Sequence, residues 1–143
     1  MRKRTVLEVA FRLQYDVINV LSEQLHGIDV DLVPMQMRVL RAIWRGDNVT
    51  SQHVVAALKR DKAQVTRLVN ELVARNLVYR EPNPNDKRSK LLKLTDEGEH
   101  IFRQVEEVEK VVFAEMAKGI AEEDMQTFFR VADMLSENMQ QME

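Results

Sequence analysis

The spacing of the apolar residues changes in the middle of this 143-residue chain, and the change limits the folds that it can adopt. In residues 62–74 the apolar side chains recur at helical intervals and form one stripe. The stripe consists of Val65, Leu68, Val69, Leu72 and Val73. The interval then falls to two at Leu77 and Tyr79, and again at Leu92 and Leu94. The pattern predicts a helix followed directly by a two-stranded hairpin, each with one buried face.

A shorter helix is predicted immediately before this one. The segment TSQHVVAALKRD favours a helix with Thr50 as its N-cap. Asp61 is the expected N-cap of the following helix, with Gln64 at the capping-box position. The turn between the helices, around Lys59 and Arg60, is so short that they must cross at a steep angle. Two short helices joined in this way are the outline of a helix-turn-helix.

The outer face of the second helix combines small and hydrogen-bonding side chains. At about 100° per residue, four positions lie opposite the apolar stripe and three more flank them. The opposite positions are Ala63, Arg67, Asn70 and Ala74, and the flanking ones are Lys62, Gln64 and Thr66. Small residues permit close approach, while Arg pairs with guanine, Asn or Gln with adenine, and Thr with the thymine methyl group. This face favours base reading over its alternative, a solvated helix surface, which is more often rich in Glu and Lys.

Positive charge is concentrated in the same third of the chain. Residues 50–95 carry ten Lys and Arg against four Asp and Glu, whereas residues 96–143 carry four against thirteen. The segment EPNPNDKRS joins the two strands, and Lys87, Arg88 and Lys90 lie at or beside its tip. Such a hairpin is a wing with cations aimed at phosphates or at the minor groove. From charge alone, a charge-patterned solvated surface is an equal alternative.

The run VTRLVNELVARNLVYREPNPNDKRSKLLKLTDEGE resembles the MarR family of bacterial winged-helix regulators. The resemblance as a whole covers roughly residues 30–105. The matching elements are TRLVNELVARNLV, the NDKRSK wing and the LKLTDEG exit into a long helix. The resemblance implies a mainly α fold with a small antiparallel hairpin, in the α+β class. It implies one domain over residues 1–143, with a winged helix-turn-helix in 34–95 and dimerisation helices in 1–33 and 96–143.

The resemblance also implies a function, a sequence-specific regulator of transcription that represses as a homodimer. Its partner is double-stranded DNA with a pseudo-palindromic operator, and its location is the cytoplasm. The expected DNA-binding residues are Thr50, Ser51, Lys62, Ala63, Gln64, Thr66, Arg67, Asn70, Asp86, Lys87, Arg88 and Lys90. The helix beginning at Asp61 is expected in the major groove and Arg88 in the minor groove. Asp86 either orients Arg88 or only forms the turn after Asn85.

The chain departs from the family pattern in three places. Val33 stands where the family usually has a Thr or Ser that caps a helix. Lys59 and Arg60 occupy a turn in which a glycine is common, which affects the angle between the two helices. Lys87 replaces a second wing arginine found in many members.

The two ends of the chain are unusually apolar. Residues 6–25 carry two adjacent apolar rows at helical spacing, more than one neighbouring helix would cover. Residues 125–142 keep a 3-4-3-4-3 apolar spacing, and residues 95–118 form a long helix between, with Thr95 as N-cap. The apolar ends pack either on the chain's own core or on the same helices of a second chain.

By resemblance, a small aromatic or phenolic anion is the expected effector. The candidate pocket residues are Tyr15, Arg38, Arg41 and Trp44, although each is equally explained as core or surface. The eight methionines are expected to fill the core, with a role in oxidation sensing as the alternative.

Catalysis is not expected. The chain has no cysteine, which fits a reducing cytosol, and its three histidines show no metal-ligand spacing. No nucleophile motif, phosphate-binding glycine loop, cofactor or membrane span is predicted. The remaining alternative to DNA binding is a winged helix that serves as a protein-interaction module without specific DNA affinity.

Overall fold

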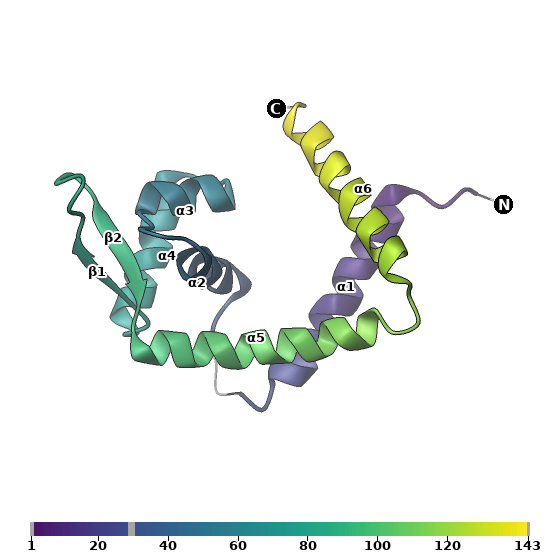
Figure 1. Cartoon of the computed structure of the whole chain (residues 1–143), viewed down its shortest axis with the longest axis horizontal. Helices are drawn as coiled ribbons and strands as arrows, with labels where there is room; N and C mark the ends of the chain where they lie inside the picture. Colours follow the sequence, from purple (N-terminus) through teal and green to yellow (C-terminus); the bar gives the residue numbers. More distant parts are fainter. Residues whose placement is uncertain (1, 29–30, 143) are drawn as a thin grey trace. The chain divides into compact units, whose positions relative to one another are not determined.

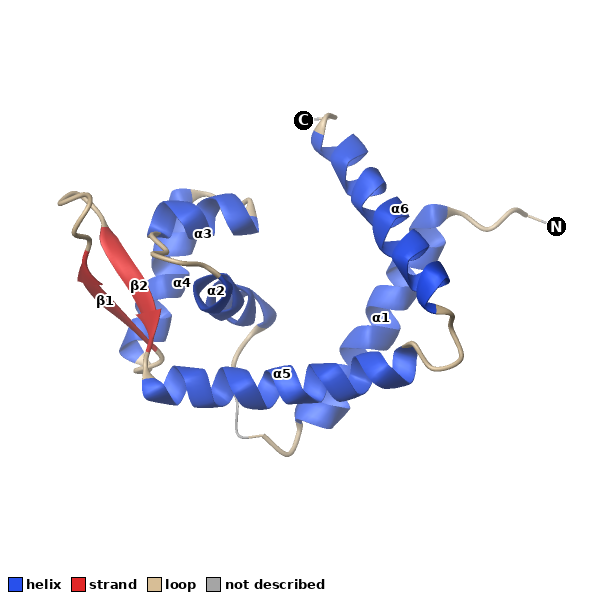
Figure 2. Cartoon of the chain, in the orientation of Figure 1, coloured by secondary structure: helices blue, strands red, loops and turns tan. Residues whose placement is uncertain are grey.

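The computed structural model describes residues 2–28 and 31–142. In these residues, six helices and one two-stranded antiparallel sheet follow one another along the chain (Figure 1). They are α1 (Val6–Leu25), α2 (Pro34–Arg45), α3 (Ser51–Leu58), α4 (Lys62–Ala74), β1 (Val78–Pro82), β2 (Lys90–Leu94), α5 (Asp96–Met116) and α6 (Glu122–Gln140). The predicted mainly α fold with a small antiparallel hairpin is confirmed, as Figure 2 shows by colour.

The helices begin where the sequence predicts. Thr50 caps α3 by accepting the N–H of His53, and Asp61 caps α4 by accepting the N–H of Gln64 at 2.8 Å. Val33 has no side-chain oxygen to cap α2. Instead, the side chain of Gln36 accepts the Val33 N–H at 3.1 Å.

The short turn between α3 and α4 depends on a left-handed residue. Lys59 has φ 53 and ψ 44, a conformation that glycine adopts without strain and that costs other residues about 1 kcal/mol or more. This geometry explains why a glycine is common here. The chain keeps the short turn with a lysine in this conformation.

One core joins α2, α3, α4, the hairpin and the first turns of α5. Its fully buried side chains include Val39 and Leu40 of α2, Val54 of α3, and Val65 and Leu72 of α4. The predicted stripe of α4 is buried as expected, with its C-terminal valine partly buried. The buried stripe fixes the opposite face of α4 toward the outside.

The predicted phase of the first strand is wrong. Tyr79 is 44% exposed, whereas Val78 is buried and Leu77 lies before the strand, with its N–H donated to the Leu72 carbonyl at the end of α4. In the second strand the neighbours Leu91 and Leu92 are both buried. Simple alternation fails in β2 because the Leu92 N–H is bonded to Val49 of the α2–α3 connection, which brings further chain against this strand.

The start of α5 is tied to the end of α4. Thr95 caps the helix by accepting the Gly98 N–H, and its own hydroxyl donates to the Asn76 carbonyl at 2.7 Å. Farther along α5, Phe102 is buried, and the centroid of its ring lies 5.7 Å from the centroid of the Trp44 ring. The hairpin and the long helix are therefore anchored to the same core as α4.

The chain forms two compact units, residues 1–108 and 109–143. In the described part of the chain, neither α1 nor α6 contains a buried side chain. No described helix is long and apolar enough to cross a membrane. The division into dimerisation and DNA-binding segments stays a prediction, and residues 1, 29, 30 and 143 of the dimerisation segments lie outside the described residues.

Candidate nucleic-acid interface

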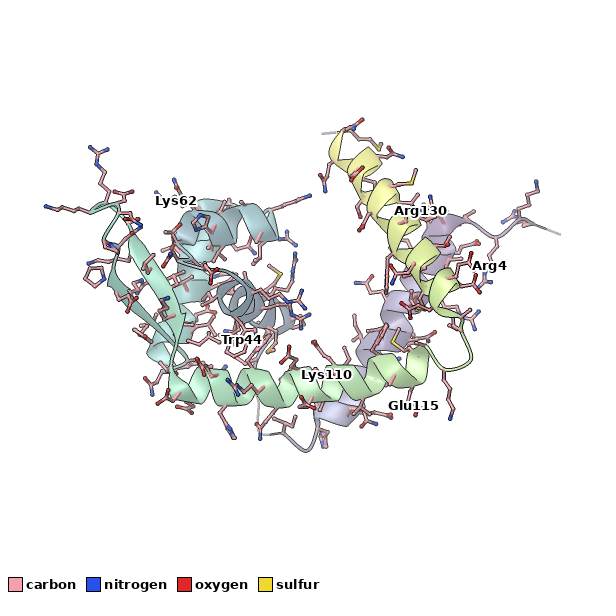
Figure 3. The ribbon with its side chains drawn as sticks, viewed as in Figure 1. Arg4, Trp44, Lys62, Lys110, Glu115 and Arg130 are labelled. Atoms are coloured by element: carbon pink, nitrogen blue, oxygen red, sulfur yellow. The ribbon has the colours of Figure 1, made fainter. Side chains whose placement is uncertain are left out.

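The outer face of α4 is exposed from end to end. A shallow hollow of about 840 Å³ runs along it. The hollow is lined by Lys62, Ala63, Thr66, Arg67, Asn70, Glu71 and Ala74. Figure 3 shows Lys62 at the start of this helix with its side chain directed away from the helical body. The structure therefore brings six of the predicted positions together with one acidic residue, while Gln64, also a candidate, is partly buried at the first turn of the helix.

Two polar links cross this face. The first is a chain from the core, in which the buried Gln36 amide donates to Glu71 at 3.0 Å. The same carboxylate lies 3.8 Å from the Arg67 guanidinium. Because the Arg67 and Glu71 side chains are 68% and 45% exposed, the ion pair contributes little to stability.

The second link joins α4 to the hairpin. The guanidinium of Arg80 on β1 donates a hydrogen bond to the side-chain oxygen of Asn70. Arg80 was not among the predicted site residues. By strand alternation it shares the face of Val78, which packs toward α4, whereas the predicted phase directed Tyr79 to that side. The correct phase of the strand would have been the signal that finds it.

Thr66 uses its hydroxyl within its own helix. That hydroxyl donates to the Lys62 carbonyl at 2.8 Å, which leaves the methyl group as the free part of the side chain. A methyl group can contact the thymine methyl but cannot select a base by hydrogen bonding. Because Ala63 and Thr66 are small, DNA can come close to the first turns of α4 on this face.

The loop of the hairpin is a chain of side-chain-supported turns. Asn83 accepts the Asn85 N–H at 3.0 Å and donates across the loop to the Ser89 hydroxyl at 2.9 Å. Asp86 accepts the backbone N–H of Arg88 at 2.9 Å. These bonds hold the loop in shape and leave the cationic side chains exposed at its tip.

The hydrogen bond between Asp86 and the Arg88 N–H bears on the two roles expected of Asp86. Its carboxylate bonds to the main chain of Arg88, which is the geometry of a turn former. By fixing the backbone at residue 88, that bond also determines where the Arg88 side chain leaves the loop. The two roles are therefore compatible in this arrangement.

The candidates at the start of α3 are less accessible. Thr50 is 9% exposed, and its hydroxyl and N–H are both engaged with His53 as the helix cap. Ser51 is half-buried beside it. The cap thus takes up the polar atoms of Thr50 that would otherwise contact DNA.

The four candidate effector residues do not form one site. Arg38 and Arg41 line a cavity of about 500 Å³ between α2 and α3, together with Arg45 and His53. Trp44 does not line this cavity; its ring is tilted against that of Phe102, and the Arg103 guanidinium lies 5.3 Å from its centroid, so its core role is the better supported one. Tyr15 lies on α1 with 67% of its surface exposed. Among the described residues, no group of three His, Cys, Asp or Glu side chains could hold a metal ion.

A helix-turn-helix with an exposed second helix, followed by a hairpin with a cationic tip, defines the class of winged helix-turn-helix proteins. Comparisons with known proteins agree with this class. The chain is 32% identical to the multiple antibiotic resistance protein MarR of Escherichia coli over 99 residues, 68% of this chain and 69% of that protein. It is 28% identical to the transcriptional repressor MdtR of Bacillus subtilis, over 66% of this chain and 61% of that one.

A solved structure gives the same result. A crystal structure of a mutant Escherichia coli MarR complexed with operator DNA matches with a TM-score of 0.74 and 27% identity, covering 89% of this chain and 90% of that chain. The model of the MarR family matches residues 30–89. This chain belongs to the MarR family. It is accordingly a DNA-binding transcriptional regulator, which agrees with the expectation that it is not an enzyme.

Proposed function

We propose that this regulator is a cytoplasmic repressor that binds a pseudo-palindromic operator as a homodimer and is released by a small organic anion. The observation that carries the proposal is the exposed face of α4, where Arg67 and Asn70 stand among small residues opposite a buried stripe. Such a face fits the major groove, and its side chains can hydrogen-bond base edges.

The wing supplies the second contact. Lys87 and Arg88 extend from a loop held by its own hydrogen bonds, and Lys90 is the first residue of β2, so their positive charge is presented without disturbing the core. Arg88 is proposed to enter the minor groove, and the two lysines to contact phosphates. The crystal structure of the MarR relative complexed with operator DNA supports DNA binding by this chain.

The apolar surfaces of α1 and α6 support a homodimer. Leu7 and Phe11 of α1 are 65% and 66% exposed, and Phe128 and Met139 of α6 are 49% and 58% exposed. Burying such surface gains about 25 cal/mol per Å², so both helices are proposed to pack against a second copy. A twofold dimer presents two copies of α4, which is why the operator is proposed to be pseudo-palindromic.

Repression is supported by the relative named as a repressor, MdtR. An effector is supported by the cavity between α2 and α3. Arg38, Arg41 and Arg45 place three cations on its wall, and its apolar lining includes Leu58. A small aromatic carboxylate or phenolate satisfies both features.

Selection from a pool of random duplex DNA tests the proposal. Full-length protein should enrich a sequence made of two inverted half-sites about one helical turn apart. Arg67→Ala should weaken binding to the enriched duplex by about 1–3 kcal/mol and flatten the preference at particular base pairs. No enrichment by the wild-type protein would favour the alternative, an interaction module without specific DNA affinity.

A further inference from the structure

We propose that Arg80 determines which base Asn70 selects, by turning the Asn70 side chain into a donor-only reader that prefers guanine to adenine. This inference rests on the proposed function, because it concerns the same face of α4. It assigns Arg80 as a specificity-determining residue that acts through Asn70.

The orientation of the Asn70 amide follows from the chemistry of its partner. A guanidinium only donates hydrogen bonds, so the atom that meets Arg80 must be the side-chain oxygen of Asn70. The Nδ2 group is then at the other end of the amide. Both residues are exposed, and Asn70 lines the hollow along α4.

The bond changes what Asn70 can do in the major groove. A free Asn pairs with adenine through two bonds, accepting from N6 and donating to N7. In this chain the accepting oxygen carries a positively charged guanidinium, and an adenine amino group arriving there would meet donor against donor. The bidentate pairing with adenine that the sequence favours for Asn70 is therefore disfavoured.

The same arrangement creates a match for guanine. The Nδ2 hydrogens of Asn70 and the remaining N–H groups of Arg80 form a pair of donors. Guanine presents two acceptors, O6 and N7, at the major-groove edge, whereas thymine presents one. The order of preference at this base pair is therefore guanine, then thymine, then adenine.

The test compares full-length wild type, Asn70→Ala, Arg80→Ala and the double variant on a random duplex pool, followed by titrations of two duplexes. The base pair read by Asn70 is the position at which Asn70→Ala changes the selected sequence. The two duplexes differ only there, with G·C in one and A·T in the other. Lys87→Ala is the matched control, because a lost phosphate contact lowers affinity evenly across sequences.

Wild type should bind the G·C duplex about fivefold or more tightly than the A·T duplex. Arg80→Ala should abolish or reverse that ratio, because a freed Asn70 can pair with adenine. In the Asn70→Ala background, Arg80→Ala should produce no gain for adenine. Circular dichroism should show unchanged helical content for all variants, since both side chains are exposed.

Three results would overturn the inference. Arg80→Ala could keep the wild-type ratio, the shift toward adenine could persist without Asn70, or Asn70→Ala could leave every position unchanged. If the wild type still binds the selected duplex in a salt-dependent way, each of these results overturns the inference and leaves the proposed function standing. Absence of any such binding by the wild type would overturn the proposed function and this inference with it.

Discussion

Gly98 holds the start of α5 against the end of α4 because it lacks a side chain. A Cβ at this position would lie 2.1 Å from the Leu77 carbonyl oxygen, the same oxygen that accepts the Thr95 N–H at 3.0 Å. The backbone of Leu77 is fixed on both sides, since its N–H is bonded to the Leu72 carbonyl and its own carbonyl to the Thr95 N–H, so it cannot move aside without cost.

Gly98→Ala is expected to lower the free energy of unfolding by about 1–3 kcal/mol, as overpacking in a fixed site does. Gly27→Ala is the matched control, since nothing lies within 4 Å of a Cβ there, and a change within about 0.5 kcal/mol is expected. Urea unfolding at one fixed protein concentration measures both. Equal stability of the two variants would contradict the close approach of Gly98 to Leu77.

Asp86 combines a structural bond with an unfavourable charge. Its carboxylate accepts the Arg88 N–H, yet it also places a negative charge in a loop proposed to approach phosphates. Asparagine at this position can accept the same N–H without the charge. The two contributions can therefore be separated by substitution.

Asp86→Asn should bind all duplexes more tightly than wild type, because repulsion of the phosphates is removed while the turn is kept. Asp86→Ala should bind less tightly than Asp86→Asn, because it loses the turn as well. Titrations on one selected duplex, at one salt concentration, give the order. If the alanine variant matched the asparagine variant, the turn would have no part in binding.

At the scale of the elements, the helices and their faces could be predicted from the sequence. Helical periodicity identifies the buried stripe of α4, and with it the exposed Arg67 and Asn70, because burial and spacing report the same face. Caps such as Asp61 are local interactions, so the sequence also contains them.

What could not be predicted depends on contacts between elements. The phase of β1 was wrong because Leu77 is used to end α4, and periodicity cannot assign one residue to two elements. Arg80 was missed for the same reason. The low exposure of Thr50 was not predicted either, because the fraction of a side chain that is buried depends on packing in three dimensions and not on its local cap with His53.

The wing gives the prediction that belongs to an element. Arg88→Ala should lower operator affinity, and more so on operators with A·T-rich flanks than with G·C-rich ones, because Arg gains most in a narrow minor groove. Lys87→Ala should weaken binding about evenly and lower the salt slope by about one unit. Titrations at several salt concentrations distinguish these effects. Unchanged operator affinity in Arg88→Ala would contradict the hypothesis that the wing binds DNA through Arg88.

At the scale of the whole molecule, charge and apolar surface are divided along the chain. The basic residues are concentrated in 50–95, which contains the helix-turn-helix and the hairpin, while residues 96–143 are strongly acidic. Apolar side chains are exposed on α1 and α6 instead. A polyanion and a second copy of the chain would thus use different elements.

Deleting residues 121–143 should give aggregated or unfolded protein, since the apolar surface of α1 would lose its proposed partner helices. A milder pair of variants separates the interface from folding. Phe128→Glu should weaken the dimer, whereas Gln126→Lys, which adds a charge at an exposed position on the same helix and keeps a favourable contact with Glu122, should not. Sedimentation measures the assembly state. A folded dimer from the deletion would show that the interface is elsewhere, and a well-folded monomer would show that folding does not require the dimer.

The central claim, specific recognition of duplex DNA by α4 and the wing, is tested most directly by titrating the full-length protein with two duplexes. One is the sequence enriched from the random pool, and the other is a scrambled duplex of the same length and composition. The enriched duplex should bind about 1,000-fold or more tightly, with both affinities falling linearly on logarithmic axes as salt rises. Equal affinity for the two duplexes at every salt concentration would contradict the claim.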